Sequence, residues 1–152
     1  MGKHDYHMHP QIITKPGWAE EFIQKAISTG IEEICFTDHM PFSLSNGKDR
    51  IPKGGIPEYC AKAAEYVDKY KDIIRIKIGV EIDYHPDYID EIEGVLQAGK
   101  FDYIIGSSHL QLEGYGLGLE NMEGDEFVDA MLKNILASVR SGYFDAVAHI
   151  DF

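Results

Sequence analysis

The sequence predicts an α/β domain with a parallel sheet, and three observations support this. Short apolar segments of strand length alternate along the whole chain with longer segments whose apolar residues recur at helical spacing. The length, 152 residues, is that of one domain. Strand–helix alternation is typical of parallel sheets with right-handed crossovers.

Five strands are expected. The first leads into His7, and in the third a row of isoleucines alternates with Arg75, Lys77 and Gly79, which puts Glu81 on the opposite face. In a barrel both faces of a strand are enclosed, so this placement is compatible with a buried site. The other expected strands cover 33–37, 73–84, 101–109 and 144–152.

Four helices separate these strands. The first starts at Pro16 and stops at Gly30, and the second runs from near Pro57 to near Asp72. The third covers 88–96, and the fourth opens at Asp125 as N-cap and stops at Gly142. The loops 41–55 and 110–124 are longer than ordinary connections, which suggests that they serve function.

Composition excludes several classes of function. The chain has 26 acidic against 14 basic residues, a net charge of −12, which argues against binding to nucleic acid or to anionic membranes. It has no apolar run of membrane length and no apolar stretch near its start. Cys35 and Cys60 lack the spacing of a redox or metal motif. We therefore expect a cytoplasmic protein with reduced cysteines.

Histidines gather where predicted strands end. Five of the seven histidines do so, and they are His7, His9, His39, His109 and His149. Glu81 and Asp83 end the third strand. Neutral imidazole and ionised carboxylate are the ligands that borderline divalent metals select. Because α/β barrels build their chemistry at the carboxyl ends of their strands, these residues predict a polynuclear metal site.

Three i, i+2 pairs strengthen this prediction, since such residues point to the same side of a strand. They are His7 with His9, Glu81 with Asp83, and His149 with Asp151. A site with at least five histidines and one or two carboxylates could hold two or three divalent ions. Glu81 is the expected bridge because a carboxylate has two oxygens. Two neighbouring metals activate water and stabilise an in-line displacement, so phosphate ester hydrolysis is the favoured reaction.

Other polar residues near the strand ends have alternative interpretations. Asp38 is expected to orient a neighbouring histidine or to contact substrate. Asp151 is expected to support His149 rather than to bind metal itself. Asp83 remains open between substrate contact, orientation of a ligand and plain solvation. Glu81, Asp38 and Asp151 are thus the catalytic candidates.

The long loop after His39 offers cations for a phosphate. Lys48, Arg50 and Lys53 lie on it and could meet a phosphate group, although a solvated loop is the simpler interpretation. Arg50 and Asp83 are the substrate-binding candidates from the strand-end and loop residues.

Taken in order, the HxH of His7 and His9, the TDH at His39, the VEIDY at Glu81, the GSSH at His109 and the HID at His149 resemble the motifs of the PHP (polymerase and histidinol phosphatase) superfamily. The resemblance extends through essentially the whole chain. TDHMPF, GVEIDY, DYIIGSSH, the Gly-Tyr-Gly loop and SGYFDAVAHIDF are most similar to the histidinol-phosphatase branch.

This resemblance implies a distorted (β/α)7 barrel with up to three zinc, manganese or iron ions. The implied reaction is hydrolysis of L-histidinol phosphate to L-histidinol and phosphate in histidine biosynthesis, with a hydroxide between metals as nucleophile. It further implies that His7 and His9 bind one metal, that Glu81 bridges it to another held by His109 and His149, and that His39 belongs to the remaining one. Tyr115, in the Gly-Tyr-Gly loop, joins the substrate-binding candidates.

Two departures from the family pattern limit this transfer. Residues 10–15 contain no further histidine after the HxH. The family barrel also has two more strands, with a late Asp-x-His pair, so residues 1–152 are expected to be an incomplete N-terminal portion of about five strands. We expect its open edge to be able to pair with another copy.

Two alternative functions stay open at this point. One is a PHP phosphoesterase that acts on nucleotides, which the acidic balance disfavours. The other is a non-catalytic metal-binding module. Among the expected metals, the one held by Glu81, His109 and His149 would have its ligands within this chain.

Overall fold

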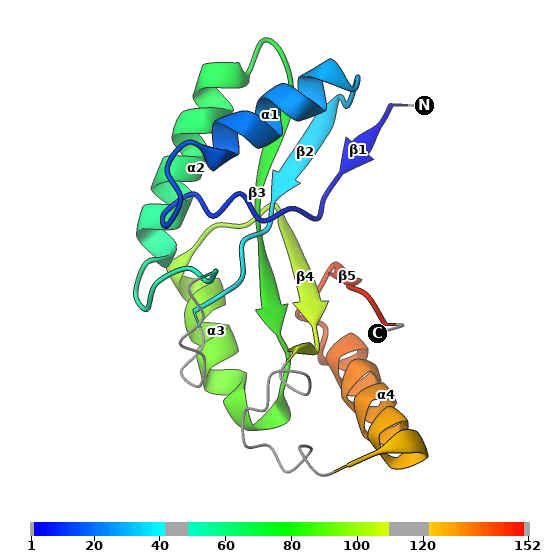
Figure 1. Cartoon of the computed structure of the whole chain (residues 1–152). Helices are drawn as coiled ribbons and strands as arrows, with labels where there is room; N and C mark the ends of the chain where they lie inside the picture. Colours follow the sequence, from blue (N-terminus) through cyan, green and yellow to red (C-terminus); the bar gives the residue numbers. More distant parts are fainter. Residues whose placement is uncertain (1, 42–48, 110–121, 151–152) are drawn as a thin grey trace.

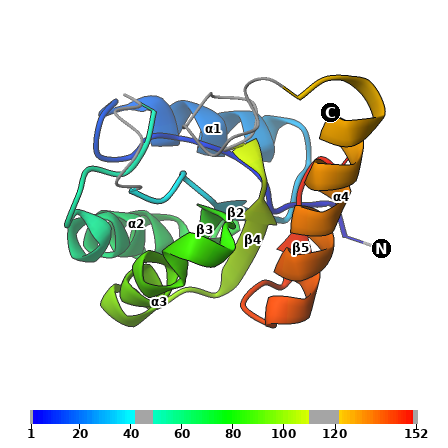
Figure 2. The same cartoon turned by 90° about the horizontal axis from the view of Figure 1, so that it is seen from below.

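The computed structural model of the chain describes residues 2–41, 49–109 and 122–150. Five parallel strands form one sheet in the order β1-β2-β3-β4-β5, and the sheet curls into a half-barrel with the helices outside it (Figures 1 and 2). The predicted α/β class and the five parallel strands are confirmed. The elements, in chain order, are β1 (His4–Asp5), α1 (Trp18–Ser28), β2 (Glu33–Phe36), α2 (Ile56–Tyr70), β3 (Arg75–Asp83), η1 (Pro86–Tyr88), α3 (Ile89–Ala98), β4 (Tyr103–Ser107), α4 (Gly124–Ser141) and β5 (Ala146–Val147).

Several predicted boundaries were wrong by a few residues. β1 ends at Asp5, before His7, and β5 ends at Val147, before His149. α4 begins at Gly124 with Glu123 as its N-cap, two residues before the predicted cap Asp125, and no side chain caps its first turn. Asp125 instead lies in the first turn, where a carboxylate stabilises the helix dipole.

The main core lies where α1 and α2 pack on β2 and β3. Ile23, Phe36 and Tyr59 are fully buried there. The Tyr59 hydroxyl lies within hydrogen-bond distance of the carbonyls of Phe36 (3.1 Å) and Gly79 (2.9 Å), so α2 is tied to both strands. At Gly79 a Cβ would come within 2.7 Å of the Cys35 sulfur, which explains why the centre of β3 carries a glycine.

The carboxyl-terminal half of β3 is enclosed on both faces. Val80, Glu81, Ile82 and Asp83 are all fully buried although they alternate between apolar and acidic side chains. This confirms that Glu81 can lie on the face opposite the isoleucines and still be inside the protein.

Cys35 and Cys60 are both free thiols. No described helix has the length and apolarity needed to cross a membrane.

Candidate metal centre

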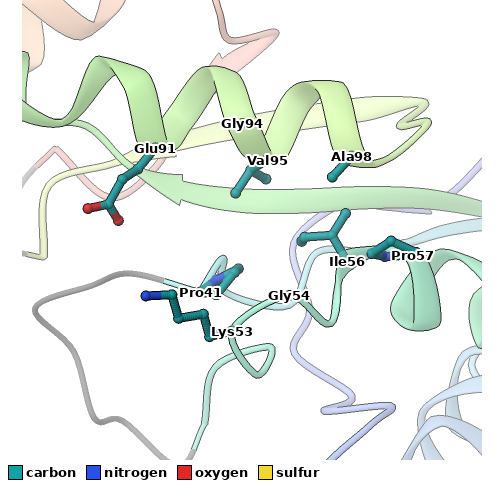
Figure 3. A pocket seen from close by; sticks show the side chains of 9 residues that line it. All are labelled: Pro41, Lys53, Gly54, Ile56, Pro57, Glu91, Gly94, Val95 and Ala98. Atoms are coloured by element: carbon teal, nitrogen blue, oxygen red, sulfur yellow. The ribbon is translucent and has the colours of Figure 1, made fainter.

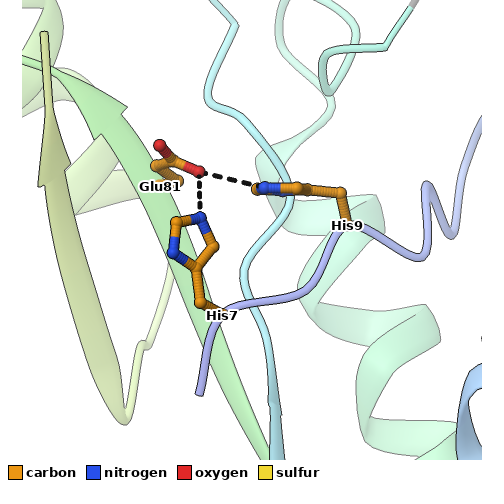
Figure 4. A group of neighbouring side chains, drawn as sticks. All are labelled: His7, His9 and Glu81. Atoms are coloured by element: carbon orange, nitrogen blue, oxygen red, sulfur yellow. Dashed lines mark hydrogen bonds and ion pairs between the residues drawn. The ribbon is translucent and has the colours of Figure 1, made fainter. Parts of the chain in front are cut away.

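Five histidines surround the carboxylate of Glu81, as the strand-end positions predict. Its Oε2 atom lies 2.9 Å from His7 Nε2, 3.1 Å from His9 Nε2 and 3.5 Å from His39 Nδ1. Figure 4 shows His7 and His9 converging on this oxygen from the segment after β1. The Oε1 atom lies 3.2 Å from His149 Nε2 and 3.5 Å from His109 Nε2.

The segment that carries His7 and His9 is fixed by Thr37, just after β2. Met8, between the histidines, donates its N–H to Thr37 Oγ1 (3.0 Å) and accepts the Thr37 N–H on its carbonyl (2.9 Å). Met8 is buried on the core side, so both flanking histidines project the other way, toward Glu81. The i, i+2 relation therefore holds although these residues lie outside β1.

Asp38 shapes the turn that follows His9. Its carboxylate accepts the backbone N–H groups of Gln11 (2.8 Å) and Ile12 (3.0 Å), and Gln11 has a left-handed φ of 50°. Burial raises the pKa of Asp38 to about 6. These contacts join Asp38 to backbone near the ligands, and its predicted catalytic role stays a prediction.

Asp83 organises the opposite side of the site. It is fully buried, and its carboxylate accepts hydrogen bonds from the Ser107 hydroxyl (3.0 Å) and the His109 backbone N–H (3.0 Å). His109 Nδ1 (3.0 Å) and Arg50 Nη2 (2.7 Å) also lie against this carboxylate. Burial alone raises the pKa of Asp83, but His109 and Arg50 outweigh it and lower the pKa to about 2. Among the three alternatives for Asp83, plain solvation is wrong, and the contacts fit orientation of a ligand.

Arg50 lies inside the protein rather than on a solvated loop. Arg50 is 7% exposed, and its guanidinium forms an ion pair with Asp83 at the end of β3. A parallel bridge to His39 joins its backbone to the site. The solvated interpretation is therefore wrong for Arg50, and its predicted contact with substrate remains a prediction.

His149 reaches the site from the segment after β5. The Ala148 N–H donates to the Gly106 carbonyl (2.9 Å), and His149 follows with a φ of 26°. Its ring centroid lies 4.7 Å from that of His109 and 5.2 Å from that of His7. Burial lowers the pKa of His149, which favours the neutral imidazole that a metal requires.

Sequence analysis missed Asn134, which connects α4 to the site. Its amide donates to the Tyr84 carbonyl (2.9 Å) and to the Ser108 hydroxyl (3.2 Å), so it joins the ends of β3 and β4. The helical spacing could have identified Asn134 from the sequence, because it shares a helical face with the buried residues Met131 and Ser138.

The charges in the cluster favour bound cations. Three imidazole nitrogens face Glu81 Oε2, more than its two lone pairs can accept as hydrogen bonds. Within the described ranges, Glu81 Oε1 and His39 Nδ1 are buried without a hydrogen bond. Burial raises the pKa of Glu81, but His7 and His9 outweigh it and hold that pKa well below its usual range. An ionised, buried carboxylate ringed by imidazoles fits a divalent metal site.

Within the part of the chain that the structure describes, two groups have ligand atoms close enough for one ion each. One group is His7, His9 and Glu81, and the other is His39, Glu81 and His109. Burial lowers the pKa of His39 to about 4, so this ring is neutral and ready to coordinate at neutral pH. The predicted assignment of His109 and His149 to one metal, with His39 at another, stays a prediction.

Three residues named as candidates from the sequence cannot be placed. Lys48, Tyr115 and Asp151 lie outside the described residues.

A separate cavity of about 400 Å³ lies between the start of α2 and α3 (Figure 3). Among the residues that line it, Lys53 and Glu91 are charged, and the rest are apolar or glycine. None of the candidate ligands lines it, so it is not the site of the metal chemistry.

Comparisons with known proteins identify the family of this chain. The PHP domain family model matches residues 5–152. A probable histidinol-phosphatase of Deinococcus radiodurans is 31% identical over 97% of this chain, and the histidinol-phosphatase of Lactococcus lactis subsp. lactis is 32% identical over 72% of it.

The solved structures agree with the fold. The histidinol phosphate phosphatase of Lactococcus lactis subsp. lactis, crystallised with zinc, L-histidinol and phosphate, matches 99% of this chain with a TM-score of 0.78 and 25% identity. The chain spans 60% and 40% of the two curated relatives and 58% of the crystallised chain. From the family match over nearly its full length, the chain belongs to the PHP domain family.

Proposed function

We propose that residues 1–152 form a PHP phosphoesterase domain and that it hydrolyses L-histidinol phosphate to L-histidinol and phosphate with the help of divalent metals. The observation that carries this proposal is the buried Glu81 carboxylate, which five imidazoles approach within 3.5 Å. Such a donor set is chemically suited to zinc, and also to manganese or iron.

The residues that would hold the metals are His7, His9, His39, Glu81, His109 and His149. Bound metals would supply an activated water and would neutralise charge on the phosphate during displacement. The protein's own contribution is orientation. Asp83 accepts the Nδ1 proton of His109, which leaves His109 Nε2 directed at Glu81.

Several details of the proposal come from the relatives. Both curated relatives are named as histidinol phosphatases, and the Lactococcus structure holds zinc, L-histidinol and phosphate. Since the net charge is −12, a small substrate suits this chain better than a nucleic acid. Histidine biosynthesis in the cytoplasm, and pairing of copies through the open edge of the sheet, belong to the same proposal.

The test compares substrates and a matched pair of variants. We expect the zinc-, manganese- or iron-loaded chain to release phosphate from L-histidinol phosphate faster than from a panel of nucleoside monophosphates. Glu81→Gln should lose bound metal and at least about 100-fold in turnover. Glu65→Gln, an exposed carboxylate on α2, should change neither. Circular dichroism of each variant separates lost folding from lost chemistry.

Each alternative has its own outcome in this test. Equal or faster turnover of nucleotides would indicate a different PHP phosphoesterase. A chain that binds metal through Glu81 but hydrolyses nothing would be a metal-binding module.

A further inference from the structure

The outer face of α4 carries an apolar stripe that no described residue covers. Val128, Leu132, Leu136 and Val139 are 45%, 50%, 46% and 59% exposed. Their spacing of four, four and three residues puts them on one face of the helix. Met131 and Ser138 occupy the inner face and are buried. We call these four exposed residues the α4 stripe.

The α4 stripe differs from the rest of the surface. Among the described residues, the other large apolar side chains that are exposed are those of Trp18, Ile73 and Ile150, and they lie singly on separate segments. Both views of the molecule place α4 at its margin (Figures 1 and 2). Single exposed apolar side chains are ordinary, whereas a contiguous apolar face marks an interaction surface.

Charges beside the α4 stripe indicate which partner fits. At about 100° per residue, Glu126, Asp129, Lys133 and Arg140 fall on one side of the stripe. All four are exposed. Glu126 and Asp129 lie in the first half of the helix, Lys133 lies at its middle and Arg140 lies in its last turn. The flank therefore has opposite charge at its two ends.

This distribution is self-complementary in an antiparallel arrangement. A two-fold axis across the stripe brings the acidic end of one α4 beside the basic end of its copy, on the same side of the pair. Val128 then faces Val139 of the copy, and Leu132 faces Leu136. In a parallel two-fold pair the two charged flanks would lie on opposite sides of the contact, so the acidic and basic ends could not pair.

We propose that the α4 stripe is a dimer interface, at which α4 packs antiparallel on α4 of a second copy of this chain. The proposal does not rest on the phosphatase function. A second copy binds well only if the charges at one end of α4 complement those at the other end. An unrelated partner would not require this complementarity. The open edge of β5 is a different surface and is not part of this contact.

The experiment measures association of the full 152-residue chain with zinc present, by sedimentation velocity over a range of concentrations. We expect a dimer with a Kd on the order of 1–100 µM. Leu132→Glu should weaken association at least about 10-fold by placing a charge in the stripe. Ile73→Glu makes the same change at an exposed residue away from α4 and should leave the Kd unchanged.

Charge reversal tests the antiparallel geometry. Asp129→Arg and Arg140→Glu should each weaken the dimer about 10-fold, because the pair occurs twice in a two-fold dimer. Asp129→Arg with Arg140→Glu in one chain should restore it. A chain that stays monomeric at all concentrations, a dimer insensitive to Leu132→Glu, or a double variant as weak as the single ones would each overturn the proposal. A monomer that binds a separate strand–helix polypeptide through this face would do so too.

Discussion

The regions from β1 to α3 and from α4 to β5 are stabilised in very different ways. The buried core cluster runs from Met8 to Val95, whereas the later region adds to it only partly buried side chains among the described residues: Ala137, Tyr143 and Phe144. Along the 18 residues of α4, Met131 and Ser138 are buried. β5 is two residues long. The first region is thus a packed core, and the second is held by few contacts.

The candidate metal centre spans both regions. His7, His9, His39 and Glu81 are anchored in the packed region, while His149 follows β5. The core therefore preorganises the buried Glu81 carboxylate, whereas closure of the site depends on the weakly packed segment that carries His149. Bound metal would connect His149 to Glu81 and so couple the two regions.

The sharpest contrast is expected from large-to-small substitutions. Phe36→Ala, in fully buried β2, should lower the free energy of unfolding by about 3–5 kcal/mol because it leaves a cavity. Val139→Ala, on the exposed face of α4, should change it by less than about 0.5 kcal/mol in dilute protein, where pairing adds nothing. Urea denaturation measures both. Equal losses would show that α4 is packed as well as the core.

Arg50 tests whether the loop after β2 belongs to the packed region. Arg50→Met leaves the Asp83 carboxylate buried without its guanidinium partner, so we expect a loss of about 3–5 kcal/mol. Lys53→Met, at an exposed position of the same loop, is the control and should cost little.

The same pair predicts an acid dependence. The pKa of Asp83 is lowered from 3.8 to about 2, so its contribution to stability is present above 3.8 and is lost as the pH falls through about 2. In Arg50→Met this loss should begin at higher pH. Acid unfolding that is identical in the variant and the parent would contradict a stabilising role for the pair.

Metal binding should reduce the contrast between the regions. Zinc at about 100 times its Kd should raise the free energy of unfolding by about 2.7 kcal/mol. Protection from hydrogen exchange should increase most in residues 142–149, because His149 is otherwise held to Glu81 by a 3.2 Å contact. His149→Ala should keep part of the global stabilisation but lose this local protection. Uniform protection along the chain would mean that metal does not bind through His149.

The fold and the identities of the ligand candidates followed from the sequence for a physical reason. Parallel strands end at one edge of the sheet, so His39 and His109 had to meet Glu81 once the strands were recognised. The buried alternation in β3 was also predictable from its isoleucines. Local sequence patterns carry this information because they repeat with the period of a strand or a helix.

Long-range contacts of single polar residues could not be predicted in this way. The sequence favours a solvated loop for Arg50 because nothing local shows that its guanidinium reaches Asp83, 33 residues later in the sequence. Asp38 accepts backbone N–H groups from the segment after His9, which no side-chain pattern announces. The exposure of the α4 stripe was also hidden, because an apolar helical face predicts burial without saying against what.

The smallest effect is expected at Asn134, whose amide links α4 to the ends of β3 and β4. Asn134→Ala removes its hydrogen bonds to the Tyr84 carbonyl and the Ser108 hydroxyl and should cost about 1 kcal/mol. Hydrogen exchange should rise in residues 105–109 and along α4 but not in β2. Lys133→Ala, at the exposed neighbouring position, controls for helix propensity. If both variants lose the same stability, the hydrogen bonds of Asn134 contribute nothing beyond helix propensity, which would contradict this prediction.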